Sequence, residues 1–333
     1  MERALEMLSK VRQLAEQGKH TSLVSLLAEQ PQEEIEASPT LSLLLGSAHA
    51  RLGRHGEGER WVNVALTRAS ERGDRAIEAR ALNVKGAIAL EAGQIDAATK
   101  YFMQAADVAK LVGDDETLGL SSNNLGIIKN LRGNPGAAIG SYTIALAAFQ
   151  RAGLERGAAM IHHNLAISYG NQGKTTEALK EADRAVEKAE QAGDSALAAQ
   201  ALSGRAELRV RAGDVALAHK EAEQAISKHR ELEDPVGEAE DLRILALAKA
   251  TEGAKSEAET LLRNAMNQAE NHGRPLLAAS AGKDLAYLLR DSGKSDEAIE
   301  MARAARAQFS HLGAASDVNK LDELLGEIAG KSG

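Results

Sequence analysis

The chain has 333 residues, of which 44% are apolar and only 2% aromatic, so its interior has to be built from alanine and leucine rather than from large rings. Its formal net charge of −8 opposes a dominant role in binding nucleic acid or an anionic membrane, because both need a basic surface. The sequence contains no cysteine, no run of eighteen apolar residues and no apolar leader after Met1. These features predict a cytoplasmic protein without disulfides, thiolate metal sites or a membrane span.

Residues 1–38 are expected to form an N-terminal helical cap and connector. Residues 2–29 predict a short helix pair that turns at Gly18. The stretch from Pro31 to Pro39 is rich in helix breakers and lies outside the repeat that follows.

A 40-residue repeat begins at residue 39 and is marked by glycine. The first series is Gly53, Gly93, Gly133, Gly173, Gly213, Gly253 and Gly293. The second is Gly73, Gly113, Gly153, Gly193, Gly273 and Gly313, with Glu233 in the place of one glycine. Because helices commonly end at a glycine in the left-handed region, each repeat should consist of two helices and two turns. The pattern predicts seven such repeats over residues 39–318.

Small residues recur at fixed positions within both helices of each repeat. The column in the first helix is Gly46, Gly86, Gly126, Ala166, Ala206, Ala246 and Ala286. The second helix carries two such columns, seven residues apart, which places them on one helix face. We expect these faces to meet, so that the two helix axes approach closely.

The chain should end in one more amphipathic helix. Residues 316–329 place Val318, Leu321, Leu324, Leu325 and Ile328 on one stripe. We therefore assign residues 319–333 to a C-terminal capping helix and tail.

The small-residue pattern in NLAISYGNQGKTTEALKEADRAVEKA, residues 164–189, resembles the tetratricopeptide repeat (TPR). The 40-residue step, with Gly-Asp at 73–74, 113–114 and 193–194, is similar to the long-helix variant of Pins-type adaptors and bacterial regulator arrays. The resemblance implies an all-α, right-handed α-solenoid superhelix of antiparallel helix pairs. It also implies that the first helices line a concave groove that binds a protein or peptide partner.

The resemblance, carried over repeat by repeat, assigns a set of first-helix residues to a peptide-binding groove. They are Asn83, Asn123, Asn124, Ile127, Asn130, His163, Asn164, Ile167, Asn171, Ser203, Arg243 and Lys283. Asparagine offers both donors and an acceptor, so the middle of this set could satisfy the backbone of an extended peptide. The alternative is that these asparagines are ordinary solvated residues or make local helix-end contacts. His163 could tune the binding with pH.

Two further groups of residues have alternative interpretations. Arg243 and Lys283 could receive an acidic end of the ligand, or they could form surface ion pairs worth little each. Trp61 and Tyr101 occupy equivalent places on second helices and form a candidate convex patch, either for a second contact or for a homo-oligomer. Alternatively, these rings cover the junction with the cap.

Motifs that resemble catalytic or nucleotide sites are incomplete. Residues 173–175 and 293–295 resemble the end of a phosphate loop, but Ser168 and Leu288 stand where that loop requires a glycine. His162 and His163 are adjacent and therefore lie on different faces of a helix, which is unsuitable for a shared metal. We predict no enzymatic activity, no cofactor, no metal and no nucleic-acid partner.

Two functions are compatible with these features. The first is a protein–protein interaction scaffold or adaptor that binds an extended peptide segment of a partner in the groove. The second is a regulatory sensor that binds a signalling peptide or small effector and changes its superhelical shape.

Overall fold

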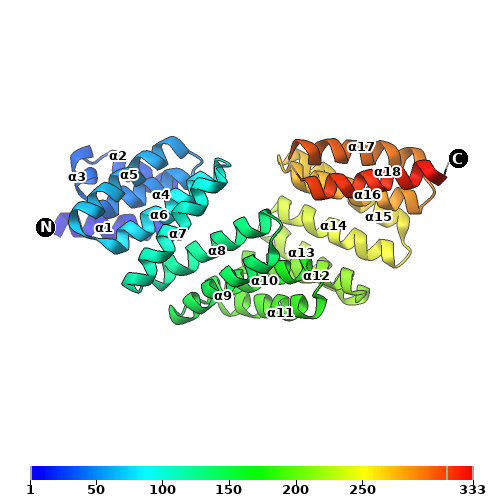
Figure 1. Ribbon diagram of the computed structural model, residues 1–333, viewed down its shortest axis with the longest axis horizontal. Coiled ribbons are helices and arrows are strands. Elements are labelled where there is room, and N and C mark those ends of the chain that lie inside the picture. Colours follow the sequence, from blue (N-terminus) through cyan, green and yellow to red (C-terminus); the bar gives the residue numbers. More distant parts are fainter. Residues whose placement is uncertain (1, 313, 332–333) are drawn as a thin grey trace. The chain divides into compact units, whose positions relative to one another are not determined.

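The structure, a computed structural model, describes residues 2–312 and 314–331. Eighteen helices and no strands occupy these residues, and Figure 1 shows them in chain order. Their bounds are α1 Glu2–Glu16, α2 His20–Ala28, α3 Gln32–Ala37, α4 Pro39–Arg51, α5 His55–Arg72, α6 Arg75–Glu91, α7 Ile95–Val112, α8 Asp115–Leu131, α9 Pro135–Arg151, α10 Glu155–Asn171, α11 Thr175–Gln191, α12 Ser195–Ala212, α13 Val215–Glu231, α14 Pro235–Thr251, α15 Lys255–Asn271, α16 Pro275–Asp291, α17 Ser295–His311 and α18 Ala315–Lys331.

The prediction of an all-α fold built from tandem antiparallel helix pairs is confirmed. Two details at the ends differ from expectation. The connector between Pro31 and Pro39 contains the short helix α3, because residues 32–38 include no proline or glycine. The last helix begins at Ala315, so the expected boundary between residues 318 and 319 falls inside α18.

The Gly-Asp dipeptides end one helix and begin the next. Gly73 adopts a φ of 64°, in the left-handed region that glycine tolerates. The carboxylate of Asp74 then accepts a hydrogen bond of 3.1 Å from the backbone N–H of Ile77, which caps α6. Residues 113–114 and 193–194 repeat this arrangement. The dipeptide therefore fixes the reversal between one helix pair and the next.

Glu233 occupies the glycine position of one turn and still takes the left-handed conformation, with a φ of 53°. Among the residues that the structure describes, it is the one non-glycine residue with positive φ. A side chain in this region is penalised by its contact with the following carbonyl. The predicted turn at Gly313 lies outside the described residues.

The small residues of the first-helix column face large side chains of the second helix. A Cβ atom built on Gly86 would lie 2.7 Å from the ring of Phe102, and Gly126 faces the ring of Tyr142 in the same way. Both rings are fully buried. Glycine is therefore required where a ring fills the space between the paired helices, and the alanine-bearing repeats pack smaller partners there.

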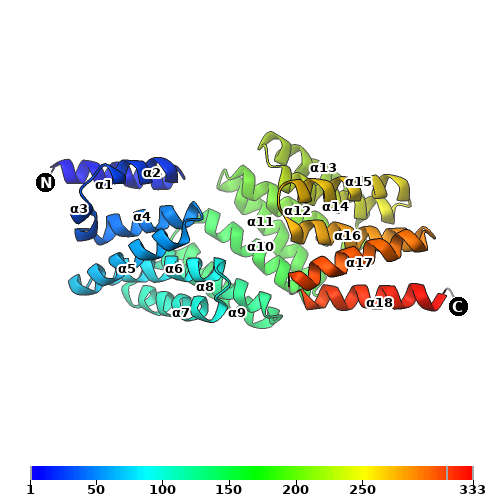
Figure 2. The same ribbon diagram turned by 90° about the horizontal axis from the view of Figure 1, so that it is seen from above.

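The chain divides into two compact units, Met1–Asn164 and Leu165–Gly333. In the first unit, α1 and α2 lie beside α4 (Figure 2). Leu23, Leu27 and Ile35 of the N-terminal helices pack with Leu45 and Trp61 in one apolar cluster. Burial of this cluster attaches the N-terminal helices to the first repeat.

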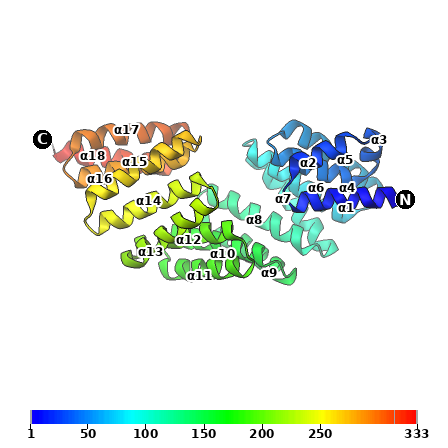
Figure 3. The same cartoon turned by 180° about the vertical axis from the view of Figure 1, so that it is seen from behind.

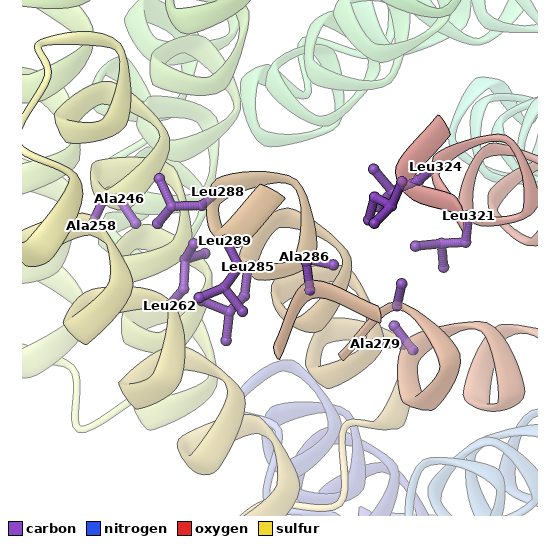
Figure 4. Close-up of a cluster of buried hydrophobic side chains, with 14 of the residues drawn as sticks. Ala246, Ala258, Leu262, Ala279, Leu285, Ala286, Leu288, Leu289, Leu321 and Leu324 are labelled. Carbon is purple, nitrogen blue, oxygen red and sulfur yellow. The ribbon is translucent and has the colours of Figure 1, made fainter. Parts of the chain in front are cut away.

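In the second unit, the C-terminal helix packs on the last helix pair. Figure 3 shows α18 beside α16 and α17, and its contact with α17 is the more extensive of the two. The apolar cluster in Figure 4 joins Leu262 of α15 to Leu285 and Leu289 of α16, and it continues to Leu321 and Leu324 of α18. The predicted apolar stripe of the last helix is thus buried as one face.

Candidate functional site

The first helices of successive pairs contact one another within each unit. In the first unit α6 touches α4 and α8, and in the second unit α14 touches α12 and α16. We call each of these arrangements a first-helix layer. The predicted groove residues all lie on helices of this kind, namely α6, α8, α10, α12, α14 and α16.

Asn123 and Asn164 bind each other across neighbouring repeats. The Nδ2 atom of Asn164 donates a hydrogen bond of 2.8 Å to Oδ1 of Asn123. Asn123 is only 4% exposed. The acceptor of Asn123 is therefore used to join α8 to α10.

Three other members of the predicted set are also used inside the fold. The hydroxyl of Ser121 donates to Oδ1 of the half-buried Asn83 at 3.0 Å. Ser203 is buried and donates to the carbonyl of Ala199 at 3.0 Å. Asn130 donates to the hydroxyl of Tyr142 at 3.4 Å. Asn83, Asn123 and Asn130 therefore make hydrogen bonds between helices of the fold, which neither interpretation of the asparagines described.

Asn124 differs from its neighbour because its side chain makes no hydrogen bond to any described residue. It is half-buried and lies on one face of α8 with Leu120, Ile127 and Leu131, at spacings of three to four residues. Leu131 is 69% exposed, which is unusual for a large apolar side chain. This α8 stripe therefore offers an uncommitted amide between accessible apolar side chains.

The corresponding residues of α10 are partly accessible as well. Ile167 is 43% exposed, Asn171 is exposed and His163 is half-buried. Burial lowers the pKa of His163 below its usual value of 6.5. His163 is therefore neutral at pH 7, with a single N–H donor and one acceptor nitrogen.

The cationic residues of the second unit are paired with carboxylates of their own layer. Arg243 lies 2.6 Å from Asp284 and 3.2 Å from Glu207, and these neighbours raise the pKa of the largely buried guanidinium. Lys283 lies 2.5 Å from Asp317. Arg243 and Lys283 are therefore both engaged in ion pairs within the protein, as the second interpretation of these residues expected.

A cavity of about 380 Å³ opens in the second unit beside Arg243. Val236 and Glu240 of α14 line it from one side. The turn at Gly273 and the first residues of α16, including Pro275 and Leu276, line it from the other. Sequence reasoning did not single out this site. A detectable signal was Leu276, an apolar residue directly after a turn, which is 56% exposed.

His229 and Asp241 form a buried pair that the sequence analysis also missed. Nδ1 of His229 lies 2.6 Å from Oδ2 of Asp241, and Asp234 lies 4.0 Å from Nε2 on the other side of the ring. The hydrogen bond to Asp241 raises the pKa of His229, and burial raises the pKa of Asp241. Twelve residues separate the two in sequence, so no short motif reveals the pair.

The proposed convex patch is not a pair of exposed rings. Trp61 is 6% exposed and packs with Val11 and Leu27 of the N-terminal helices. Tyr101 is half-buried, and Nζ of Lys85 lies 5.0 Å from the centre of its ring. Trp61 therefore covers the junction with the cap, which was the alternative interpretation of this residue.

The described residues form neither a metal-binding cluster nor a membrane-spanning helix. No group of three or more His, Cys, Asp or Glu side chains there could hold a metal ion. None of the described helices is both long and apolar enough to cross a bilayer.

One part of the chain matches a known sequence family. Residues 37–111, from the end of α3 to the last turn of α7, match the family described as Tetratricopeptide repeat. No curated protein matches the chain.

Several solved structures share the fold. The chain is similar to a Rap protein complexed with Competence and Sporulation Factor, with 13% identity, 99% of each chain covered and a TM-score of 0.63. The apo quorum sensor NprR from B. thuringiensis is 15% identical over 98% of this chain and 99% of its own, with a TM-score of 0.58. A signal transduction ATPase with a tetratricopeptide repeat sensor, from Pyrococcus horikoshii, is 13% identical, and 98% of this chain covers 48% of that one with a TM-score of 0.70. At these identities the likeness concerns the fold.

Proposed function

We propose that this tetratricopeptide-repeat protein is an interaction scaffold that binds an extended peptide segment of a partner protein on the first-helix layer of its first unit. The α8 stripe of Leu120, Asn124, Ile127 and Leu131 is the observation that carries the proposal. Asn124 offers two donors and an acceptor that no described residue uses. An extended peptide has one N–H and one C=O at each residue, which a single amide can engage together.

The apolar members of the stripe supply the second part of the interaction. Ile127 and Leu131 lie one turn and two turns beyond Asn124 on the same helix face. Covering exposed apolar surface of this kind contributes roughly 25 cal/mol per Å². Backbone binding at Asn124 with apolar contacts beside it would give affinity without a strict requirement for one peptide sequence.

The Asn123–Asn164 hydrogen bond has a supporting role in this proposal. It connects α8 to the next first helix directly beside Asn124. An amide that is positioned before binding loses less side-chain entropy when the ligand arrives. Asn123 is thus assigned to positioning, and Asn124 to contact with the peptide. The Rap structure in complex with its factor supports the view that this fold can hold a ligand.

A binding selection with the full chain tests the proposal. A displayed library of short random peptides is selected on the wild-type protein, and the recovered peptides are titrated against Asn124→Ala. We expect affinity to fall about tenfold, which corresponds to the loss of one or two hydrogen bonds to the peptide backbone. Asn267→Ala is the matched control, because Asn267 is an exposed asparagine on the second helix α15. Recovery of no peptide, or equal affinity of both variants, would contradict the scaffold function.

A regulatory sensor is the second function that we propose, since two of the similar structures are named as a sensor or as containing one. A sensor must bind its ligand differently in two shapes of the chain. Small-angle scattering with and without a selected peptide distinguishes the two functions. A scaffold should keep its radius of gyration, and a sensor should change it. A cytoplasmic location and a homo-oligomeric state stay parts of the proposal.

A further inference from the structure

Two charged groups in the lining of the cavity beside Arg243, Glu240 and Arg274, make no hydrogen bond or ion pair with a described residue. Arg243 is held by Asp284 and Glu207 at 2.6 and 3.2 Å. Glu240, one turn earlier on α14, makes no hydrogen bond or ion pair with a described residue. The acidic group of the cavity is therefore available, whereas the basic group next to it is already neutralised.

The surroundings of Glu240 disfavour its own negative charge. Solvent reaches the side chain, yet desolvation by the cavity wall raises the pKa of the carboxyl above its usual value. Glu207 and Asp241 act in the same direction by repulsion, and Arg243 only partly opposes them. A cation placed beside Glu240 would relieve this repulsion, whereas a second anion would increase it.

Apolar side chains form much of the remaining wall of the cavity, together with Arg274 and Ser280. Val236 of α14 faces Pro275, Leu276 and Leu277 at the start of α16 across a space of about 380 Å³. The side chains of arginine and lysine combine an aliphatic stem with a cationic end, so they match a pocket with apolar walls and one carboxylate. Pockets of a few hundred Å³ suit a ligand group of this size.

We propose that this cavity of the second unit is a specificity pocket for a basic side chain, arginine or lysine, of a peptide ligand. The inference rests on the proposed function, because the basic residue belongs to the same class of ligand. The aliphatic stem lies against Val236 and Leu276, and the cationic end pairs with the Glu240 carboxylate. The ligand group proposed for this place is thus positively charged, whereas the sequence analysis considered an acidic ligand end at Arg243.

Arg274 is the one residue of the cavity lining that could compete. It is exposed, precedes α16, and makes no capping hydrogen bond with its side chain. If the guanidinium of Arg274 lies against the Glu240 carboxylate in the free protein, a basic ligand has to displace it. Arg274→Ala should then leave the affinity for basic peptides unchanged or increase it.

Selections with the random peptide library test the inference with the full chain. Peptides are selected in parallel on wild type, Glu240→Gln, Glu240→Lys and Glu300→Gln. Glu300 is an exposed glutamate on the second helix α17 and serves as the matched control. Wild type and Glu300→Gln should enrich arginine or lysine at one peptide position, and titration should show about tenfold weaker binding of these peptides to Glu240→Gln. Glu240→Lys should enrich aspartate or glutamate instead.

The outcomes separate this inference from the proposed function. Peptides that need Asn124 but show no basic preference, or the same preference in Glu240→Gln, would overturn the pocket and leave the scaffold standing. Loss of binding in Arg274→Ala, with full binding in Glu240→Gln, would assign the cavity to an acidic side chain. If wild type selects no peptides at all, both proposals are wrong. Circular dichroism of each variant checks folding, which Glu240→Gln should preserve because Glu240 makes no hydrogen bond or ion pair with a described residue.

Discussion

The guanidinium of Arg243 binds the carboxylate of Asp284, which lies 41 residues later in the chain. Asn123 and Asn164 show the same separation and bind each other at 2.8 Å. Asn123 and Arg243 occupy the same position of the repeat, three repeats apart. This position therefore joins consecutive first helices in both units, by an amide pair in the first and by an ion pair in the second.

The amide pair should contribute measurably to stability. Asn123→Ala removes the acceptor of Asn164 and leaves a cavity at a buried position. We expect the free energy of unfolding to fall by about 1–3 kcal/mol, because a partly buried amide loses its partner. Urea denaturation measures the change. Asn267→Ala should change it by less than about 0.5 kcal/mol, as surface substitutions usually do. Equal stability of the two variants would contradict the joining role.

The ion pair should be more sensitive to removal of one partner. Arg243→Met leaves the carboxylates of Asp284 and Glu207 without their shared cation in a mostly buried site. Breaking a buried pair in this way costs about 3 kcal/mol or more. Arg303→Met on the exposed face of α17 provides the matched control. A melting temperature of Arg243→Met within the range of that control would show that the pair is energetically unimportant.

The fold could be predicted from the sequence because its signals are local. A glycine such as Gly73 ends a helix through its own backbone conformation, and Asp74 begins the next through a bond to Ile77, three residues away. The small residues opposite rings follow the same logic, since Gly126 has to accommodate Tyr142 within one helix pair. Forty-residue spacing repeats these local rules and thereby reveals the architecture.

The candidate site was predictable only in part, because it depends on helix rotation. Asn123 and Asn124 are adjacent, but successive residues of a helix point about 100° apart. The side chain of Asn123 therefore lies in the interface between repeats, and that of Asn124 stays accessible. Sequence spacing does not specify that angle. Similarly, the partners of Arg243 are 41 and 36 positions away along the chain, on other helices. Only the packed structure shows that Arg243 is committed and Glu240 is not.

Glu233 should be a point at which the protein can be stabilised. It adopts a left-handed φ of 53° where the corresponding turns have glycine. Glu233→Gly relieves the strain of a side chain in this region, roughly 1–2 kcal/mol, and increases the entropy of the unfolded chain, which offsets part of the gain. We expect a net increase of about 0.5–1 kcal/mol in the free energy of unfolding, measured by urea denaturation.

The reciprocal substitution at Gly193 is the control for this change. Gly193 has a φ of 66° at the equivalent turn, and a Cβ there would meet no atom within 4 Å. Gly193→Glu therefore tests backbone strain without steric clash, and it should lower stability by a similar amount. If both substitutions change stability in the same direction, left-handed strain is not the cause.

Stability should depend on pH through the buried His229–Asp241 pair. The pKa of His229 in the folded chain is raised above 6.5 by Asp241, with smaller contributions from Asp234 and Glu240. Its stabilising contribution is therefore complete below 6.5 and is lost as pH rises through the raised folded pKa. Deprotonation of His229 also leaves the Asp241 carboxylate buried beside a neutral ring. Burial already raises the pKa of Asp241, so both groups disfavour the folded state at higher pH.

Urea denaturation between pH 6 and 9 should show a decline in the free energy of unfolding for wild type that is absent in His229→Gln. His163→Gln is the control, because burial lowers the pKa of His163 and its effect on stability appears only on acidification. A parallel decline in His229→Gln would contradict the role of this pair.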